Sequence, residues 1–115
     1  MTERLTKERA IELFRQQWSD MRDRIGENPY PHEREIFKNM WIDEHFPGEE
    51  VECGCFLCEY DIQQQDGDQC DLCPIEWPGG HCVATDSTHC YNSPISEILA
   101  LPERKETQYD TNETV

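Results

Sequence analysis

The sequence predicts a small, α-rich domain that is stabilised by a metal ion. Apolar residues recur at helical spacing in the first part of the chain, and two Cys-x2-Cys pairs occur between residues 55 and 73. A chain of 115 residues with 36% hydrophobic residues can build only a small core, so a metal is a common source of additional stability. We expect a single zinc-stapled domain over residues 1–103, followed by a polar tail at 104–115.

A helical hairpin is expected over residues 5–46, and its first helix has clear end signals. Thr6 is a typical N-cap, and Gly26 followed by Asn28-Pro29 is typical of a helix end. The apolar side chains between them recur at three- and four-residue steps and predict a buried stripe. Its members are Ile11, Phe14, Trp18, Met21 and Ile25, with Leu13 beside them.

The second helix of the hairpin is expected from about His32 to His45, because Pro47-Gly48 would end it. The pattern predicts that Ile36, Phe37, Met40 and Trp41 form its buried face. Helical spacing alone accounts for the large aromatic residues of both helices, so we interpret them as core residues and not as ligand-stacking groups.

Residues 49–92 follow neither a helical nor a strand period and are rich in Cys, Gly, Pro, Asp and Gln. This composition is typical of loops that a metal holds together, so we expect a zinc-loop segment here. A short helix is expected over residues 93–101, with Ser93 as N-cap, Pro94 in the first turn and Pro102 after its end.

Four cysteines have the spacing of a zinc site. The pairs Cys55/Cys58 and Cys70/Cys73 are separated by eleven residues, so each pair can hold one side of a tetrahedral ion. Four protein ligands leave no open position, which predicts a structural and not a catalytic zinc. Four thiolates would also accept iron, although nothing in the sequence resembles a ferredoxin run.

The other cysteines leave alternatives open. Cys82 could replace one of the four ligands, whereas Cys53 is expected to be unliganded because Cys55 is better placed. The dipeptides His81-Cys82 and His89-Cys90 could form a second metal site or remain unliganded. A nucleophilic Cys-His pair is disfavoured, because acidic surroundings oppose thiolate formation. We therefore expect no catalytic residues.

Charge is distributed very unevenly. Residues 1–38 contain eight acidic and eight basic residues, whereas residues 39–103 contain fourteen acidic residues and no Lys or Arg, out of a total net charge of −15. Phosphate backbones are bound chiefly by Lys and Arg, so direct nucleic-acid binding is not expected. An acidic surface of this kind favours a protein partner with a basic surface.

The N-terminal region contains no signal peptide and the chain contains no membrane span, which predicts a cytoplasmic protein with reduced thiols. No contact with a membrane is expected. Reduced cysteines remain available to bind a metal.

The residue pattern also resembles a family. The run from Cys55 to Tyr60, followed by Cys70-Asp-Leu-Cys73-Pro-Ile-Glu-Trp77 and Cys82, is similar to small uncharacterised zinc-binding proteins encoded by phages and prophages of Firmicutes. The likeness covers about residues 5–25 and 53–103. It implies a zinc-binding phage accessory protein in the host cytoplasm and supplies no catalytic residues.

Together these features predict a non-enzymatic protein that binds and inhibits or redirects a host protein, including a defence protein, with DNA mimicry as a variant. Two alternatives remain. One is a small metal-dependent hydrolase or nuclease that uses His45, His81 or His89. The other is a nucleotide-signal-binding protein in which Arg15, Arg22 or Arg34 meets a phosphate.

Overall fold

A computed structural model describes residues 3–51, 54–64, 73–78, 89–90 and 93–103. Four helices make up most of this part: α1 (Lys7–Ile25), α2 (Pro31–His45), α3 (Phe56–Gln64) and α4 (Ile95–Leu99). The described residues contain no β-sheet, only an isolated antiparallel bridge between Ile75 and Glu103. The predicted α-rich class is confirmed.

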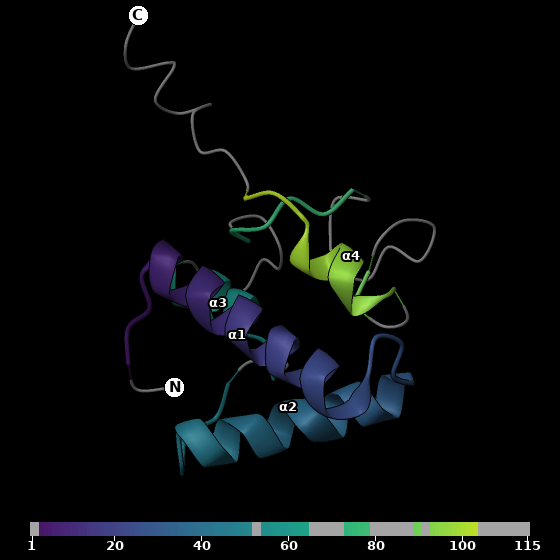
Figure 1. Ribbon diagram of the computed structural model, residues 1–115. Helices are drawn as coiled ribbons and strands as arrows, with labels where there is room; N and C mark the ends of the chain where they lie inside the picture. Colours follow the sequence, from purple (N-terminus) through teal and green to yellow (C-terminus); the bar gives the residue numbers. More distant parts are fainter. Residues whose placement is uncertain (1–2, 52–53, 65–72, 79–88, 91–92, 104–115) are drawn as a thin grey trace, which may run out of the picture.

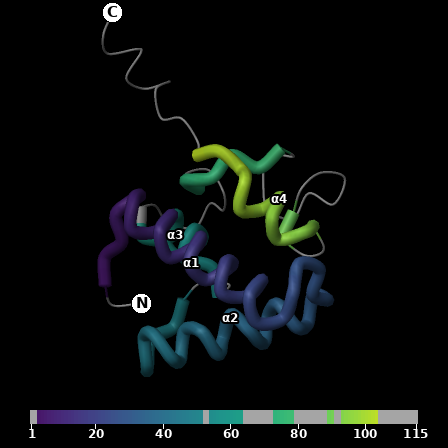
Figure 2. The backbone as a smooth tube through the Cα atoms, in the orientation of Figure 1, coloured from purple at the N-terminus to yellow at the C-terminus, as the bar shows by residue number. Residues whose placement is uncertain are grey.

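α1 is the central element of the fold, and each of the other helices packs against it. α2 runs antiparallel to α1 along one side, α4 and residues 73–78 lie on the opposite side, and α3 lies next to the N-terminal half of α1 (Figures 1 and 2). Such a central helix needs an apolar surface wider than one stripe. Its buried residues are Ala10, Ile11, Leu13, Phe14, Gln17, Trp18 and Met21.

The predicted ends of α1 are confirmed. The Thr6 hydroxyl accepts a hydrogen bond from the Arg9 backbone N–H at 3.1 Å, as an N-cap side chain does. At the other end the Gly26 N–H donates to the Arg22 carbonyl at 3.0 Å. Gly26 has a φ of +108°, a region that favours glycine. Ile25 was predicted to belong to the buried stripe, but its side chain is 43% exposed, so the prediction was wrong for this residue.

α2 confirms two of its four predicted core residues. Phe37 and Trp41 are buried, but Ile36 and Met40 are 56% and 47% exposed. The buried side of α2 is instead completed by Arg34 and Ile42. Ile36 lies two residues, or about 200° around the helix, from Arg34, and Met40 lies about 100° from Trp41, so both side chains project away from the buried side. The predicted buried face was therefore wrong for these two residues.

α3 was not predicted, because residues 49–92 were expected to be metal-tied loops. Its buried residues are Phe56 and Leu57 but also the acidic residues Glu59 and Asp61. Carboxylates at buried positions remove the apolar period from the sequence. Gln63 joins α3 to the N-terminal segment, since its side chain accepts from Leu5 N–H at 2.7 Å and donates to the Glu3 carbonyl at 2.9 Å.

The core gathers large aromatic side chains around α1. Phe14 lies 6.0 Å from Trp18 and 6.3 Å from Trp77, the latter in a T-shaped arrangement, measured between ring centroids. Trp41 meets Phe56 at 5.7 Å, which connects the end of α2 to the start of α3. Trp18, Phe37 and Trp41 are at most 4% exposed, so their predicted role as core residues is confirmed.

Candidate functional site

The first cysteine pair lies at the start of α3. A turn precedes it, in which the Gly54 N–H donates to the Val51 carbonyl at 2.9 Å and Gly54 has a φ of +65°. The Cys55 carbonyl then accepts from the Glu59 N–H at 3.0 Å, so Cys55 is the residue before the helix and Cys58 lies in its first turn. Residues three apart on a helix share one side, so the two half-buried side chains lie one turn apart.

The second cysteine pair is described only in part. Cys73 is 6% exposed and begins the segment 73–78 beside the core. Cys70, the alternative ligand Cys82, and also Cys53 and His81, lie outside the described residues. In the described ranges, no three His, Cys, Asp or Glu side chains are grouped so as to hold a metal ion. The four-cysteine site therefore remains a prediction, and the described residues supply its first pair.

The placement of Cys55 and Cys58 fits the chemistry of that predicted site. Thiolates bind zinc, and a helix N-terminus favours negative charge because its backbone N–H groups point outward. Two sulfurs one turn apart would supply two ligands on one side of an ion.

The His89-Cys90 dipeptide is held to the helical hairpin by a buried arginine. Arg34 is 2% exposed, donates from Nε to the Pro29 carbonyl at 2.9 Å, and donates from Nη1 to the Cys90 carbonyl at 3.2 Å. Its guanidinium carbon also lies 5.8 Å from the centre of the Trp18 ring. His89 is fixed from the other side, where its N–H donates to the Ser93 hydroxyl at 2.9 Å.

Arg34 places a positive charge beside the Cys90 backbone. The composition of residues 39–103 is acidic, and among the described residues the Arg34 guanidinium lies next to the Cys90 carbonyl. Burial lowers the pKa of Arg34, while the charges of Cys90 and Glu27 act in the opposite direction. Arginine stays protonated even when its pKa falls, so Arg34 remains a buried cation. Sequence analysis missed this role, although Arg34, Phe37 and Trp41 follow each other at helical spacing.

The described histidines are occupied by local contacts. The ring of His45 stacks on Trp41 at 3.8 Å between centroids, and its Nδ1 lies 2.9 Å from the Trp41 carbonyl oxygen. His32 stacks on Tyr30 at 6.2 Å. The Nδ1 of His89 lies 3.4 Å from the Ser93 hydroxyl.

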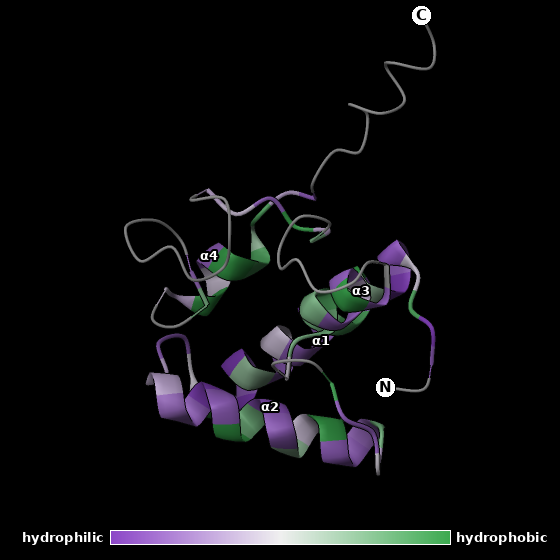
Figure 3. Ribbon diagram, turned by 180° about the vertical axis from the view of Figure 1, so that it is seen from behind, coloured by the Kyte–Doolittle hydropathy of each residue, from purple (hydrophilic) through white to green (hydrophobic). Residues whose placement is uncertain are grey.

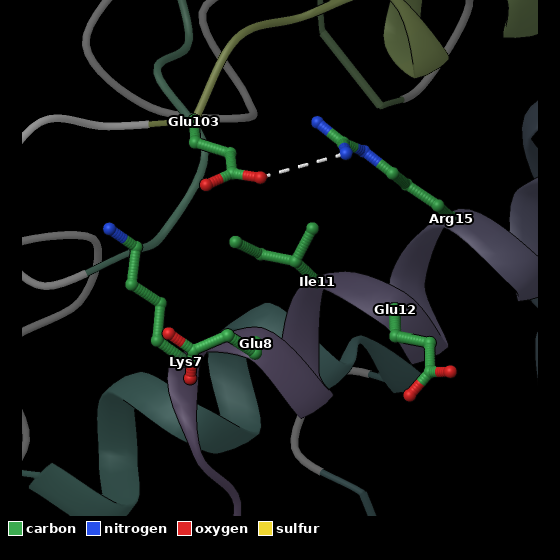
Figure 4. A pocket seen from close by; sticks show the side chains of 6 residues that line it. All are labelled: Lys7, Glu8, Ile11, Glu12, Arg15 and Glu103. Carbon is green, nitrogen blue, oxygen red and sulfur yellow. Dashed lines mark ion pairs between the residues drawn. The ribbon is translucent and has the colours of Figure 1, made fainter.

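One hollow lies on the surface of α1. It has a volume of about 270 Å³ and is lined by the charged residues Lys7, Glu8, Glu12, Arg15 and Glu103 around Ile11 (Figure 4). Arg15 and Glu103 form an ion pair across it at 3.7 Å. Small-molecule pockets are mostly apolar and hold few polar groups, so this hollow does not resemble one. Arg15 is engaged by Glu103 and by the Leu101 carbonyl at 3.4 Å, which leaves little support for nucleotide binding.

Two further carboxylates tie elements together and were not predicted. Asp20 Oδ2 accepts a hydrogen bond from Trp41 Nε1 at 2.7 Å, which joins α1 to α2. Glu27 accepts from the Ser96 backbone N–H at 2.6 Å, which joins the loop after α1 to α4. Both contacts are long-range, so no local sequence pattern indicates them.

No helix in the described part of the chain combines the length and the apolar character needed to cross a bilayer. Comparison of the chain with protein-family models, with curated proteins and with solved structures finds no match.

Proposed function

We propose that this protein is a non-enzymatic interaction protein whose acidic surface binds a partner with a basic surface. The observation that carries the proposal is that the basic and the acidic side chains differ in how many of them have partners within the molecule. Basic residues are largely engaged within the molecule, whereas many acidic residues face solvent.

The described basic side chains are mostly paired or stacked. Arg9 pairs with Glu12 at 2.9 Å and Arg24 with Glu44 at 3.5 Å, in addition to the Arg15 pair across the hollow. Lys38 lies over the Trp18 ring at 5.7 Å, on the same core residue as the buried Arg34. These cations are partly neutralised or shielded, so they add little positive potential at the surface.

Exposed carboxylates occur on every helix except α3 and on two of the connecting segments. They include Glu8, Asp23, Glu35, Asp43, Glu50, Glu76 and Glu97. With a net charge of −15, the molecule attracts basic surfaces and accelerates their association through its long-range field.

A structural zinc held by Cys55, Cys58, Cys70 and Cys73, with Cys82 as the alternative ligand, completes the proposal. The zinc would hold the connections around α3 in place and would take part in no reaction. The resemblance to phage proteins supports a host protein as the partner, with inhibition or redirection as the outcome. If the partner is a DNA-binding protein, the acidic surface acts as a DNA mimic and displaces DNA from it.

Capture from a Firmicutes host lysate tests the proposal when two charge-matched variants are compared. The first is E50K/E76K/E97K, which reverses acids after residue 39. The second is E8K/E12K/D23K, which reverses acids on α1. Each substitution adds two charge units, so both variants change the net charge from −15 to −9.

The proposal predicts that the wild type retains a basic protein that the first variant loses and that the second variant still retains. Retention of the same proteins by all three would contradict it. If added DNA displaces the captured protein, the partner is a DNA-binding protein and the acidic surface acts as a DNA mimic.

A further inference from the structure

α2 carries an apolar pair on its solvent side. Ile36 and Met40 are 56% and 47% exposed, and they lie four residues apart, so they are neighbours on one side of the helix. The opposite side of α2 is the buried one and packs against α1. Figure 3 shows α2 along one edge of the molecule, with hydrophobic and hydrophilic residues alternating along it. The apolar pair therefore belongs to the surface.

Carboxylates surround this pair. Glu33 lies three residues before Ile36, and Asp43 and Glu44 lie three and four residues after Met40, so all three follow the same side of the helix. Glu33 caps its helix by accepting from the Tyr30 N–H at 2.8 Å, and Glu44 pairs with Arg24. The side chain of Asp43 has no hydrogen bond or ion pair with another described residue and is exposed. We name this surface the α2 face.

The charge of the α2 face selects among possible occupants. A second copy of the chain would place these carboxylates against each other, and a nucleic acid or an anionic membrane would bring phosphates to them. A helix with apolar residues at three- and four-residue steps and Lys or Arg beside them would match both the apolar pair and its acidic border. Only this last occupant is complementary in charge.

We infer that the α2 face is the docking site for a basic amphipathic helix of the partner protein. The inference rests on the proposed function and deepens it, because it gives the acidic surface one location and one kind of ligand. Ile36 and Met40 supply the apolar contact, and Glu33, Asp43 and Glu44 interact with the flanking cations of the partner.

A synthetic helical peptide of Leu and Lys, with Leu at three- and four-residue steps, is a suitable probe. Its controls are the same peptide with Glu in place of Lys and a scrambled peptide of the same composition. Calorimetry measures affinity, and backbone amide NMR shifts of the full chain locate binding. The protein variants are I36S/M40S and the matched control I25S, which removes an exposed isoleucine from α1. Thermal unfolding verifies that each variant is folded.

The inference predicts amide shifts centred on α2, a loss of affinity of roughly tenfold or more in I36S/M40S, and a change within about twofold in I25S. The Glu peptide should not bind, and the scrambled peptide should bind more weakly. Binding that shifts other surfaces and is unaffected by I36S/M40S would overturn the inference and leave the proposed function standing.

Absence of binding by any basic peptide would contradict both the inference and the proposed function. Dimerisation that I36S/M40S abolishes would assign the α2 face to a second copy and overturn the inference. Stronger shifts on α2 from a DNA duplex or from anionic phosphatidylserine vesicles would also overturn it.

Discussion

The carboxylate of Glu27 accepts a hydrogen bond from the backbone N–H of Ser96 at 2.6 Å, across 69 positions of sequence. The Glu27 carbonyl also accepts from the Ile95 N–H at 2.9 Å. The first N–H groups of a helix have no partner within the helix, so Glu27 satisfies two of them in α4. A helix of only five residues depends strongly on such support.

We expect the contribution of Glu27 to stability to depend on pH. Hydrogen bonds from Ser96 lower the pKa of Glu27 below 4.5, with smaller contributions from Arg22 and Arg34. Because the pKa of Glu27 is lower in the folded state, its ionised carboxylate stabilises the protein fully above pH 4.5. This stabilisation is lost as the pH falls through the folded-state pKa. Thermal unfolding should therefore show E27Q less stable than the wild type at pH 7 but not at pH 2. An equal difference at both pH values would count against this assignment.

Arg34 should be a major determinant of stability. Arg34→Ala removes two hydrogen bonds to backbone carbonyls and leaves space beneath Trp18, so we expect a loss of about 2–4 kcal/mol. Arg34→Lys should recover only part of it, because one ammonium group cannot reach both carbonyls in the geometry of a guanidinium. Urea unfolding measures both variants.

Arg15→Ala is the control for Arg34, since Arg15 makes only an exposed ion pair and one long hydrogen bond. We expect it to cost less than about 1 kcal/mol. Equal costs at the two positions would show that Arg34 does not hold the Cys90 segment.

The contact between Asp20 and Trp41 should stabilise the hairpin by about 1 kcal/mol, as expected for a hydrogen bond to a charged group that is partly exposed. Asp20→Ala should lose this amount, and Asp20→Asn should retain much of it because the amide oxygen still accepts from Trp41. Asp23→Ala, at an exposed acid nearby, should change the free energy of unfolding by less than about 0.5 kcal/mol. A cost for Asp20→Asn equal to that of Asp20→Ala would mean that the charge and not the hydrogen bond matters.

Metal content gives a direct test of the cysteine prediction. Native mass spectrometry of freshly purified protein should find one zinc per chain, and Cys55→Ser, Cys58→Ser, Cys70→Ser and Cys73→Ser should each lose it, whereas Cys53→Ser should not. Loss of zinc in Cys82→Ser with retention in Cys70→Ser or Cys73→Ser would identify Cys82 as the ligand. A chelator should lower the melting temperature, because zinc binding is coupled to folding. Iron in place of zinc, or no metal, would contradict the prediction.

The sequence predicted those parts of the fold that local signals determine. Thr6 and Gly26 marked the ends of α1, and the spacing of Phe37 and Trp41 indicated the buried side of α2. The short helix near residue 95 was also expected, although Pro94 and not Ser93 is the residue that precedes it. Each of these features depends on neighbours within one or two helical turns.

The parts that the sequence did not predict depend on contacts between distant segments. Arg34 is buried because its guanidinium donates hydrogen bonds to the backbone carbonyls of Pro29 and Cys90. A charged residue therefore belongs to the buried side of α2, and Ile36 does not. α3 was missed because the acidic residues Glu59 and Asp61 are buried in it and interrupt the apolar pattern. The candidate site was predicted as four cysteines, and only the turn that joins Cys55 to Cys58 is supported by the described residues.

If the acidic surface attracts a basic partner through its electrostatic field, the rate of their association must depend on the salt concentration. The association rate constant of the Leu-Lys peptide can be measured by stopped flow from 50 to 300 mM NaCl, a range in which the Debye length falls from about 14 to about 6 Å. We expect the rate constant to fall steeply with salt for the wild type and less steeply for variants with reduced negative charge. A rate that is independent of salt and the same in the wild type and E50K/E76K/E97K would contradict it.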